Sequence, residues 1–179
     1  VKTITVREKP TVTISGDKTA CQGTKVTLTA AGAESYEWST GETTENIVVD
    51  VTGTTPITVW AKGKNADGCW SDPVTHIITV NATPNVTISG TLDICVGSST
   101  ILTAAGASIY VWSWDGGSAM GNTLNVSPTS DKVYTVEGTD AKGCKATAST
   151  TVKVYAKPVA NIIGDTEICE GGSAKLTAS

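Results

Sequence analysis

Apolar and polar residues alternate with a period of two in short segments along most of the chain. In one such segment, Val26, Leu28 and Ala30 are separated by single threonines. This alternation is typical of a strand that turns one face to a core and the other to solvent. Glycines and polar residues separate the segments. The pattern predicts strands around 12–14 and over 26–30, 36–38, 47–51, 57–63 and 74–80.

The same pattern recurs with a period of about 74 residues, which indicates a tandem array of small modules. Cys21, Cys95 and Cys169 are evenly spaced by this period, and so are three prolines and three glycines near them. We predict the last strand of a preceding incomplete module at 1–6, module 1 at 11–80, module 2 at 85–154, and the first strands of an incomplete third module at 159–179.

The number and spacing of the strands indicate the fold of each module. About seven short strands are joined by turns, and a tryptophan, Trp38 or Trp112, lies on the third strand of each repeat. This combination is typical of an immunoglobulin-like sandwich. The fold class is therefore predicted to be all-β, with tandem immunoglobulin-like β-sandwich modules that recur once per repeat period.

The two ends of the chain and the linkers predict a larger, elongated parent. Because 1–6 and 159–179 read as parts of modules, we expect the chain to be a segment of a longer repeat protein. No signal peptide is found, so we expect its true N-terminus to lie elsewhere. The linkers VREKP, VNATP and VYAKP are short and end in proline. Such linkers are expected to be stiff, and stiff linkers between compact modules predict a rod.

Composition and charge exclude several classes of partner. The net charge is −4 and only 17% of residues are charged. Recognition of nucleic acid or of an anionic membrane needs clustered lysines and arginines, which this chain lacks. Polar residues interrupt every apolar run, so we expect no membrane insertion in this segment. Threonine and valine are abundant, which favours strands over helices.

The cysteines are expected to form disulfides, with two open pairings. Their spacing does not match a zinc site, whose ligands come in closely spaced pairs. The repeat suggests Cys21–Cys69 and Cys95–Cys144 bonds within each module. However, Cys21 precedes one strand and Cys69 follows another, which puts them at opposite ends of a simple sandwich. The alternative is a bond between modules, for instance Cys21–Cys144, and we favour the pairing within modules.

The repeated motifs resemble a known class of modules. The second repeat contains ICVGSSTILTA (94–104), YVWS (110–113) and DAKGC (140–144), and the first contains ACQGTKVTLTA, YEWS and NADGC. These motifs resemble the Ig-like repeats of large secreted or cell-surface proteins of Bacteroidota, which include adhesins linked to gliding motility and type IX secretion. The resemblance implies a secreted or cell-surface stalk or adhesin of bacterial origin. It supplies no catalytic residue.

The remaining side chains give no support for catalysis or for a cofactor. No serine or cysteine can be matched to a base and a residue that orients it, and no carboxylate pair recurs between repeats. The linkers carry lysines where a calcium site would need several carboxylates. His76, the single histidine, is replaced by Thr150 in the next repeat and is predicted to be a surface residue. We therefore expect no enzyme activity, no metal and no cofactor.

Three tryptophans do not recur and are candidate ligand contacts. Trp60, Trp70 and Trp114 have no aromatic equivalent in the other repeat, and Trp60 alternates with the inward residues Val59 and Ala61. An exposed indole can dock a sugar or a protein. Packing at a sheet edge or against a neighbouring module is the simpler interpretation of all three.

Three functions remain open from the sequence. The preferred hypothesis is a non-catalytic, rod-like stalk in a large adhesin or filament protein, with neighbouring modules of the same parent as partners. The second is direct binding of a glycan or a surface protein through the unrepeated tryptophans. The third is a spacer in a secreted polysaccharide-degrading enzyme. Fold alone does not decide among them.

Overall fold

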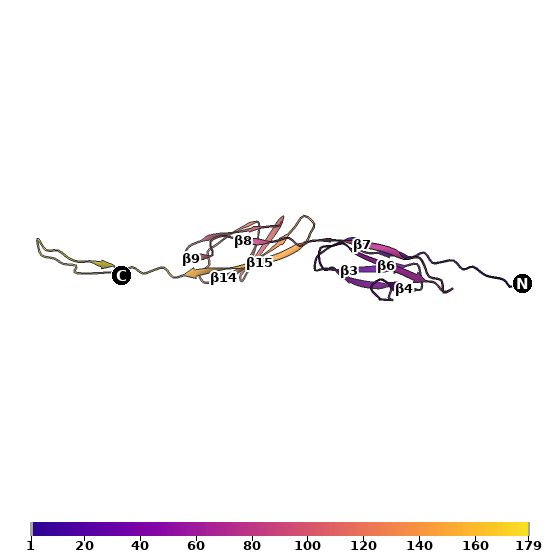
Figure 1. Ribbon diagram of the computed structural model, residues 1–179. Helices are drawn as coiled ribbons and strands as arrows, with labels where there is room; N and C mark the ends of the chain where they lie inside the picture. Colours follow the sequence, from indigo (N-terminus) through magenta and orange to yellow (C-terminus); the bar gives the residue numbers. More distant parts are fainter. Residues whose placement is uncertain (1, 179) are drawn as a thin grey trace. The chain divides into compact units, whose positions relative to one another are not determined.

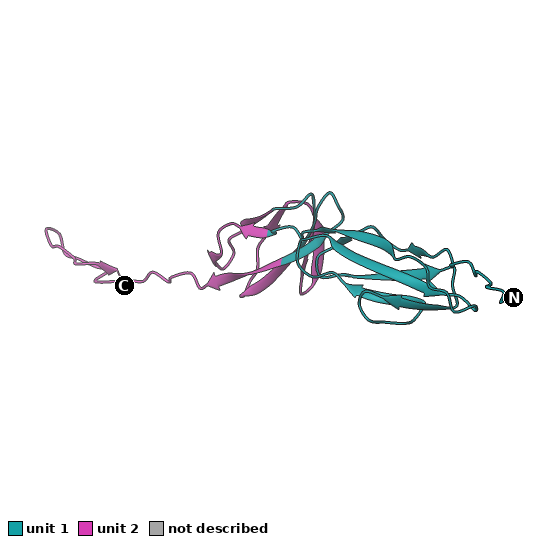
Figure 2. Ribbon diagram, turned by 45° about the vertical axis from the view of Figure 1, so that its right-hand side comes forward, with its two compact units in different colours: residues 1–86, 106–110, 137–147 teal, residues 87–105, 111–136, 148–179 magenta. Residues whose placement is uncertain are grey.

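The computed structural model describes residues 2–178, and every regular element in that range is a β-strand. The predicted all-β class is therefore confirmed (Figure 1). No helix in the described residues is long and apolar enough to cross a membrane. The chain divides into two compact units (Figure 2). Unit 1 comprises 1–86, 106–110 and 137–147, and unit 2 comprises 87–105, 111–136 and 148–179.

The strands of the first repeat form two sheets within unit 1. One sheet has the order β1-β3-β5 and the other β2-β7-β6-β4. All pairs are antiparallel except β2 with β7, which run parallel. This arrangement of strands is that of an immunoglobulin-like sandwich. The strands are β1 (Thr13–Ser15), β2 (Thr19–Cys21), β3 (Lys25–Ala31), β4 (Ser35–Trp38), β5 (Asn46–Asp50), β6 (Ile57–Lys64) and β7 (Val74–Asn81).

The core of this sandwich consists of the inward residues of both sheets. Trp38 on β4 is 1% exposed, and Leu28 on β3 is fully buried. The indole N–H of Trp38 donates to the carbonyl oxygen of Thr44 at 2.8 Å, which satisfies the one polar group of that side chain. Inward and outward residues alternate along β3, β5 and β6 as the sequence pattern predicts. The core also includes Val12, Val26, Ala30, Tyr36, Ile47, Val49, Val51, Val59, Ala61, Ile78 and Val80.

The turn between β3 and β4 requires glycine. Gly32 has a φ of 98°, and a Cβ on it would overlap the backbone carbonyl of Thr11. In the second repeat, Gly106 has a φ of 96°, and a Cβ there would overlap the carbonyl of Asn85. Both positions combine a left-handed backbone with a close approach of another segment, so only glycine fits without strain.

The strands of the second repeat lie in a three-stranded sheet of order β13-β10-β8 and a five-stranded sheet of order β12-β11-β14-β15-β9. β9 pairs in parallel with β15, as β2 does with β7. The strands are β8 (Thr87–Ser89), β9 (Asp93–Cys95), β10 (Thr100–Ala105), β11 (Ile109–Trp114), β12 (Gly117–Met120), β13 (Thr123–Val126), β14 (Lys132–Thr139) and β15 (Lys145–Tyr155).

The strand register recurs with the sequence period. Ile14 pairs with Ala30 between β1 and β3, and Ile88 pairs with Ala104 between β8 and β10. Ile162 pairs with Ala178 between β16 (Ile162–Ile163) and β17 (Thr177–Ala178). Residues 159–178 thus contain the same strand pairing as the first two repeats.

Some elements differ from the sequence prediction or lie outside it. The short strands β2 and β9 and the hairpin strand β12 were not predicted, because three- and four-residue segments carry little periodicity. Residues 2–12 contain no strand. The interpretation of 1–6 as the last strand of another module, of which Val1 lies outside the described residues, therefore stays a prediction, as do the boundaries of the modules.

Candidate functional site

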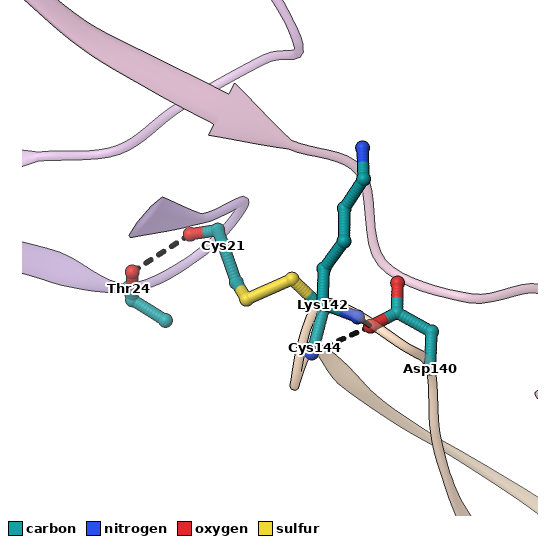
Figure 3. The surroundings of a disulfide bond; sticks show 5 residues. All are labelled: Cys21, Thr24, Asp140, Lys142 and Cys144. Atoms are coloured by element: carbon teal, nitrogen blue, oxygen red, sulfur yellow. Dashed lines mark hydrogen bonds between the residues drawn. A yellow bond between two sulfur atoms is a disulfide. The ribbon is translucent and has the colours of Figure 1, made fainter. Parts of the chain in front are cut away.

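One disulfide bond joins the first repeat to the second. Cys21 is the last residue of β2, and Cys144 lies directly before β15. Their sulfurs are bonded, and their Cα atoms are 5.5 Å apart (Figure 3). Both residues belong to unit 1, because that unit includes the β14–β15 turn. The bond closes a long stretch of chain, since its two ends are 123 residues apart in sequence.

The preferred pairing of cysteines within each module is therefore wrong. The alternative, Cys21 with Cys144, is the bond that forms, and Cys69 and Cys95 carry free thiols, as does Cys169. The reason is distance along β7. Cys21 is level with Asn81 at one end of this strand, whereas Cys69 lies beyond its other end. Seven strand residues span about 23 Å, and a disulfide needs Cα atoms within about 7 Å.

The turn that presents Cys144 is stabilised by an aspartate. The Asp140 carboxylate accepts hydrogen bonds from the backbone N–H of Lys142 at 2.9 Å and of Cys144 at 2.8 Å. The side chain of Cys144 is buried, with 1% of its surface exposed. In the first repeat Asn65 replaces the aspartate and accepts from the N–H of Cys69 at 2.9 Å. The repeated motif that ends in Gly-Cys is therefore a shared turn.

The segment before the first repeat contacts the equivalent turn of the first repeat, between β6 and β7. Arg7 forms an ion pair with Asp67 at 3.1 Å, and Lys9 pairs with Asp72 at 2.7 Å. The amide of Asn65 donates to the backbone carbonyl of Glu8 at 2.9 Å. Each exposed ion pair contributes little stability alone. Together with the hydrogen bond from the side-chain amide of Asn65, they hold residues 7–9 beside the β6–β7 turn.

Two of the three candidate tryptophans lie in unit 1. Trp60 is half-buried on the outward face of β6, between the buried residues Val59 and Ala61, as predicted. Trp70 is 38% exposed. The amines of Lys62 and Lys64 lie 5.0 Å and 5.8 Å from the centre of its ring. These cation–π contacts hold the Trp70 indole against the sheet.

The third tryptophan, Trp114, lies in unit 2 beside a surface hollow. Its ring centre is 5.8 Å from that of Tyr134, and the two rings are tilted by 49°. The hollow has a volume of about 250 Å³, is open to solvent and is lined by Trp114, Asn125, Val126, Ser127, Pro128, Lys132 and Tyr134. Burial raises the pKa of Tyr134 above its ordinary value. Sequence reasoning missed Tyr134, because it lies on a different strand from Trp114 and is distant from it in sequence.

The interpretation of His76 as a surface residue is wrong. Its side chain is 5% exposed, and its Nε2 lies 3.1 Å from the carbonyl oxygen of Asp17. His76 lies on the same face of β7 as the buried residues Ile78 and Val80. The period-two pattern of this strand could have revealed its position. His76 is therefore a buried residue whose ring contacts a backbone carbonyl.

The described residues 2–178 contain no group of three or more histidine, cysteine, aspartate or glutamate side chains that could hold a metal ion. The two arrangements that suggest a function are therefore the cross-repeat disulfide with its turn, and the hollow beside Trp114.

Comparisons with known proteins identify similar structures at low identity. No protein-family model and no curated protein matches the sequence. Fibronectin(III)-like modules of CbhA from Clostridium thermocellum are 14% identical, with a TM-score of 0.43, over 82% of this chain and 94% of that one. An adhesin with which an Antarctic bacterium binds ice is 12% identical, with a TM-score of 0.47, over 88% of this chain and 52% of that one. A 1.5-MDa bacterial ice-binding adhesin is 12% identical, with a TM-score of 0.41, over 89% of this chain and 70% of that one.

Proposed function

We propose that this chain is a non-catalytic structural segment, a rod-like stalk, of a large repetitive secreted or cell-surface adhesin-type protein. The observation that carries the proposal is the Cys21–Cys144 bond, which joins a strand end of one repeat to a turn of the next. Disulfides of this kind persist in oxidising compartments and are rare in the cytosol. The bond therefore supports a location outside the cytosol, and its placement supports a mechanical role.

The mechanism is resistance to extension. When a stalk is pulled from its ends, an unfolding module lengthens by the contour of its chain. The disulfide prevents the residues between Cys21 and Cys144 from contributing to that length, because the force passes through the bond. We propose modules 11–80 and 85–154 as the structural units. The ion pairs of Arg7 and Lys9 support a stiff entry into module 11–80, and the proline-containing linker supports a stiff junction between the two modules.

The parent protein and its location can be tested in the source organism. An antibody against residues 85–154 is used on an immunoblot and on intact cells. A very large, surface-accessible band is expected for a stalk, in agreement with the resemblance to Bacteroidota surface proteins. A modest band in the medium would instead favour a spacer of a secreted polysaccharide-degrading enzyme. A band at 18.3 kDa would contradict both, since it would be the size of this chain alone.

The hollow beside Trp114 favours a second candidate function, the binding of a glycan. Aromatic rings recognise the apolar face of a sugar, and nearby polar groups orient its hydroxyls. Trp114 and Tyr134 offer the rings, and Asn125, Ser127 and Lys132 offer polar groups. On a glycan array, Trp114→Ala should abolish any signal, whereas Trp60→Ala, a matched half-buried indole, should retain it. Equal signals from both variants and the parent would exclude this site.

A further inference from the structure

The two positions joined by the disulfide each have an equivalent that carries a free thiol. Cys21 ends β2 and is level with Asn81 of the parallel strand β7, while Cys95 ends β9 and is level with Tyr155 of the parallel strand β15. Both cysteine carbonyls accept a hydrogen bond from the N–H three residues later, at 3.1 Å for Cys21 and 2.9 Å for Cys95. The backbone around Cys95 therefore has the same strand pairing and turn as the backbone around the bonded Cys21.

The free cysteine of the first repeat matches the other bonded residue. The carbonyl of Cys69 accepts a hydrogen bond from the backbone N–H of Asn65 at 3.1 Å, and the N–H of Cys69 donates to the side-chain oxygen of Asn65 at 2.9 Å. In the second repeat, the carbonyl of Cys144 accepts from the backbone N–H of Asp140 at 2.9 Å, and the N–H of Cys144 donates to the carboxylate of Asp140 at 2.8 Å. The glycine before each cysteine has a φ of 83°. Cys69 therefore sits in the same turn as the bonded Cys144.

Both thiols are accessible to a partner. Cys95 is exposed and Cys69 is half-buried, whereas the bonded Cys144 is 1% exposed. The sulfur of Cys69 lies 3.9 Å from the carbonyl oxygen of Arg7, beside the segment that enters the first repeat. Cys169 precedes a turn in which the N–H of Gly172 donates to its carbonyl at 2.9 Å, as in the turns that follow Cys21 and Cys95.

We propose that Cys69 and Cys95 are the two open ends of a disulfide ladder between successive repeats. Cys95 bonds to the turn cysteine of a following repeat of the same kind, and Cys69 bonds to the strand-end cysteine of a preceding one. The ladder extends the Cys21–Cys144 bond to the equivalent cysteines of neighbouring repeats, whether the array is a stalk or a spacer.

Each bond of the ladder forms by thiol–disulfide exchange with an external disulfide such as oxidised glutathione. The Cys95 thiolate attacks one glutathione sulfur, which forms a mixed disulfide and releases one glutathione. The thiolate of the turn cysteine then attacks the Cys95 sulfur and releases the second glutathione. Two cysteine thiols are oxidised by two electrons, and one glutathione disulfide is reduced to two thiols that take up the two protons.

The ladder is tested by completing the third repeat. Ser179 lies one repeat period after Ala105, so a copy of residues 106–154 appended to the full chain continues the repeat. The appended copy carries Lys145→Arg, which makes its cysteine-containing tryptic peptide distinct from the original peptide 143–145. After oxidation with glutathione, the expected new cross-link joins this peptide to peptide 65–132, which contains Cys95. The variant Cys95→Ser should lose this cross-link and Cys69→Ser should keep it.

The number of free thiols gives a second readout of the same experiment. The parent chain has three free thiols, at Cys69, Cys95 and Cys169. The extended chain contains one more cysteine, yet the ladder predicts that its free thiols fall to two. Four free thiols, with Cys21–Cys144 formed in the same molecules, would overturn the proposal.

An extension at the other end tests Cys69 independently of the appended repeat. A copy of residues 11–74 placed before Val1 completes the preceding repeat, because Val1 lies one repeat period before Thr75. With Lys25→Arg in the copy, its strand-end cysteine is expected to cross-link to peptide 65–132, and Cys69→Ser should remove this link. If the added cysteines stay alkylatable in both extended chains while Cys21–Cys144 forms, the ladder does not exist.

Discussion

Reduction of the cross-repeat disulfide is expected to release a defined length of chain when the protein is pulled from its ends. With the bond intact, the force bypasses the residues between Cys21 and Cys144, which are 123 positions apart in sequence. A fully extended chain spans at most about 3.5 Å per residue, so the hidden length is about 430 Å.

Single-molecule force spectroscopy measures this length directly. The chain is held by its two termini and unfolded before and after addition of a reductant. The total contour length should increase by about 430 Å on reduction. Cys21→Ser should show the longer contour without reductant. Cys95→Ser, which removes the equivalent but unbonded cysteine, should behave as the parent chain.

The result that would refute this reasoning is equally specific. If the disulfides were Cys21–Cys69 and Cys95–Cys144, Cys95→Ser would increase the contour length of the oxidised chain just as Cys21→Ser does. An increment on reduction that is unchanged in Cys21→Ser would likewise show that another pair of cysteines carries the bond.

Three further predictions concern stability. Gly32→Ala should lower the free energy of unfolding by about 3 kcal/mol or more, because both the left-handed backbone and the nearby carbonyl of Thr11 oppose a Cβ. Gly41 has a φ of 96° but no atom close to its Cβ position, so Gly41→Ala should lower it by only about 1 kcal/mol in the same denaturation assay. Trp38→Ala should cost about 3–5 kcal/mol and Trp70→Ala less than about 1 kcal/mol, and equal losses would contradict the assigned core. Reduction of the disulfide should lower the free energy of complete unfolding by about 5 kcal/mol, and an unchanged denaturation midpoint would contradict that loop-closure argument.

Much of the fold followed from the sequence because its long strands alternate clearly. The burial of Val26, Leu28 and Ala30 on β3, and of Trp38 on β4, follows from the period-two pattern alone. The parallel strand β2 could not be predicted in the same way. It is three residues long, and its position beside β7 is set by tertiary pairing.

The disulfide was mispredicted because repeat symmetry was used to pair cysteines within modules. Symmetry establishes which cysteines are equivalent, and it is equally compatible with bonds within repeats and between them. The choice depends on which end of β7 lies beside Cys21, and hence on the short strand β2 that the sequence did not reveal. The prediction for His76 is wrong for a different reason, since its replacement by Thr150 in the next repeat says nothing of burial, whereas its position between Val74 and Ile78 places it on the inward face.

Peptide mapping of the oxidised chain tests the central claim most directly. Trypsin places Cys21 in peptide 19–25, Cys144 in peptide 143–145, both Cys69 and Cys95 in peptide 65–132, and Cys169 in peptide 154–175. Without reduction, mass spectrometry should detect 19–25 joined to 143–145, and an alkylated 65–132 that is joined to neither. A single species in which 65–132 carries both of the short peptides would contradict the cross-repeat bond and the mechanical function built on it.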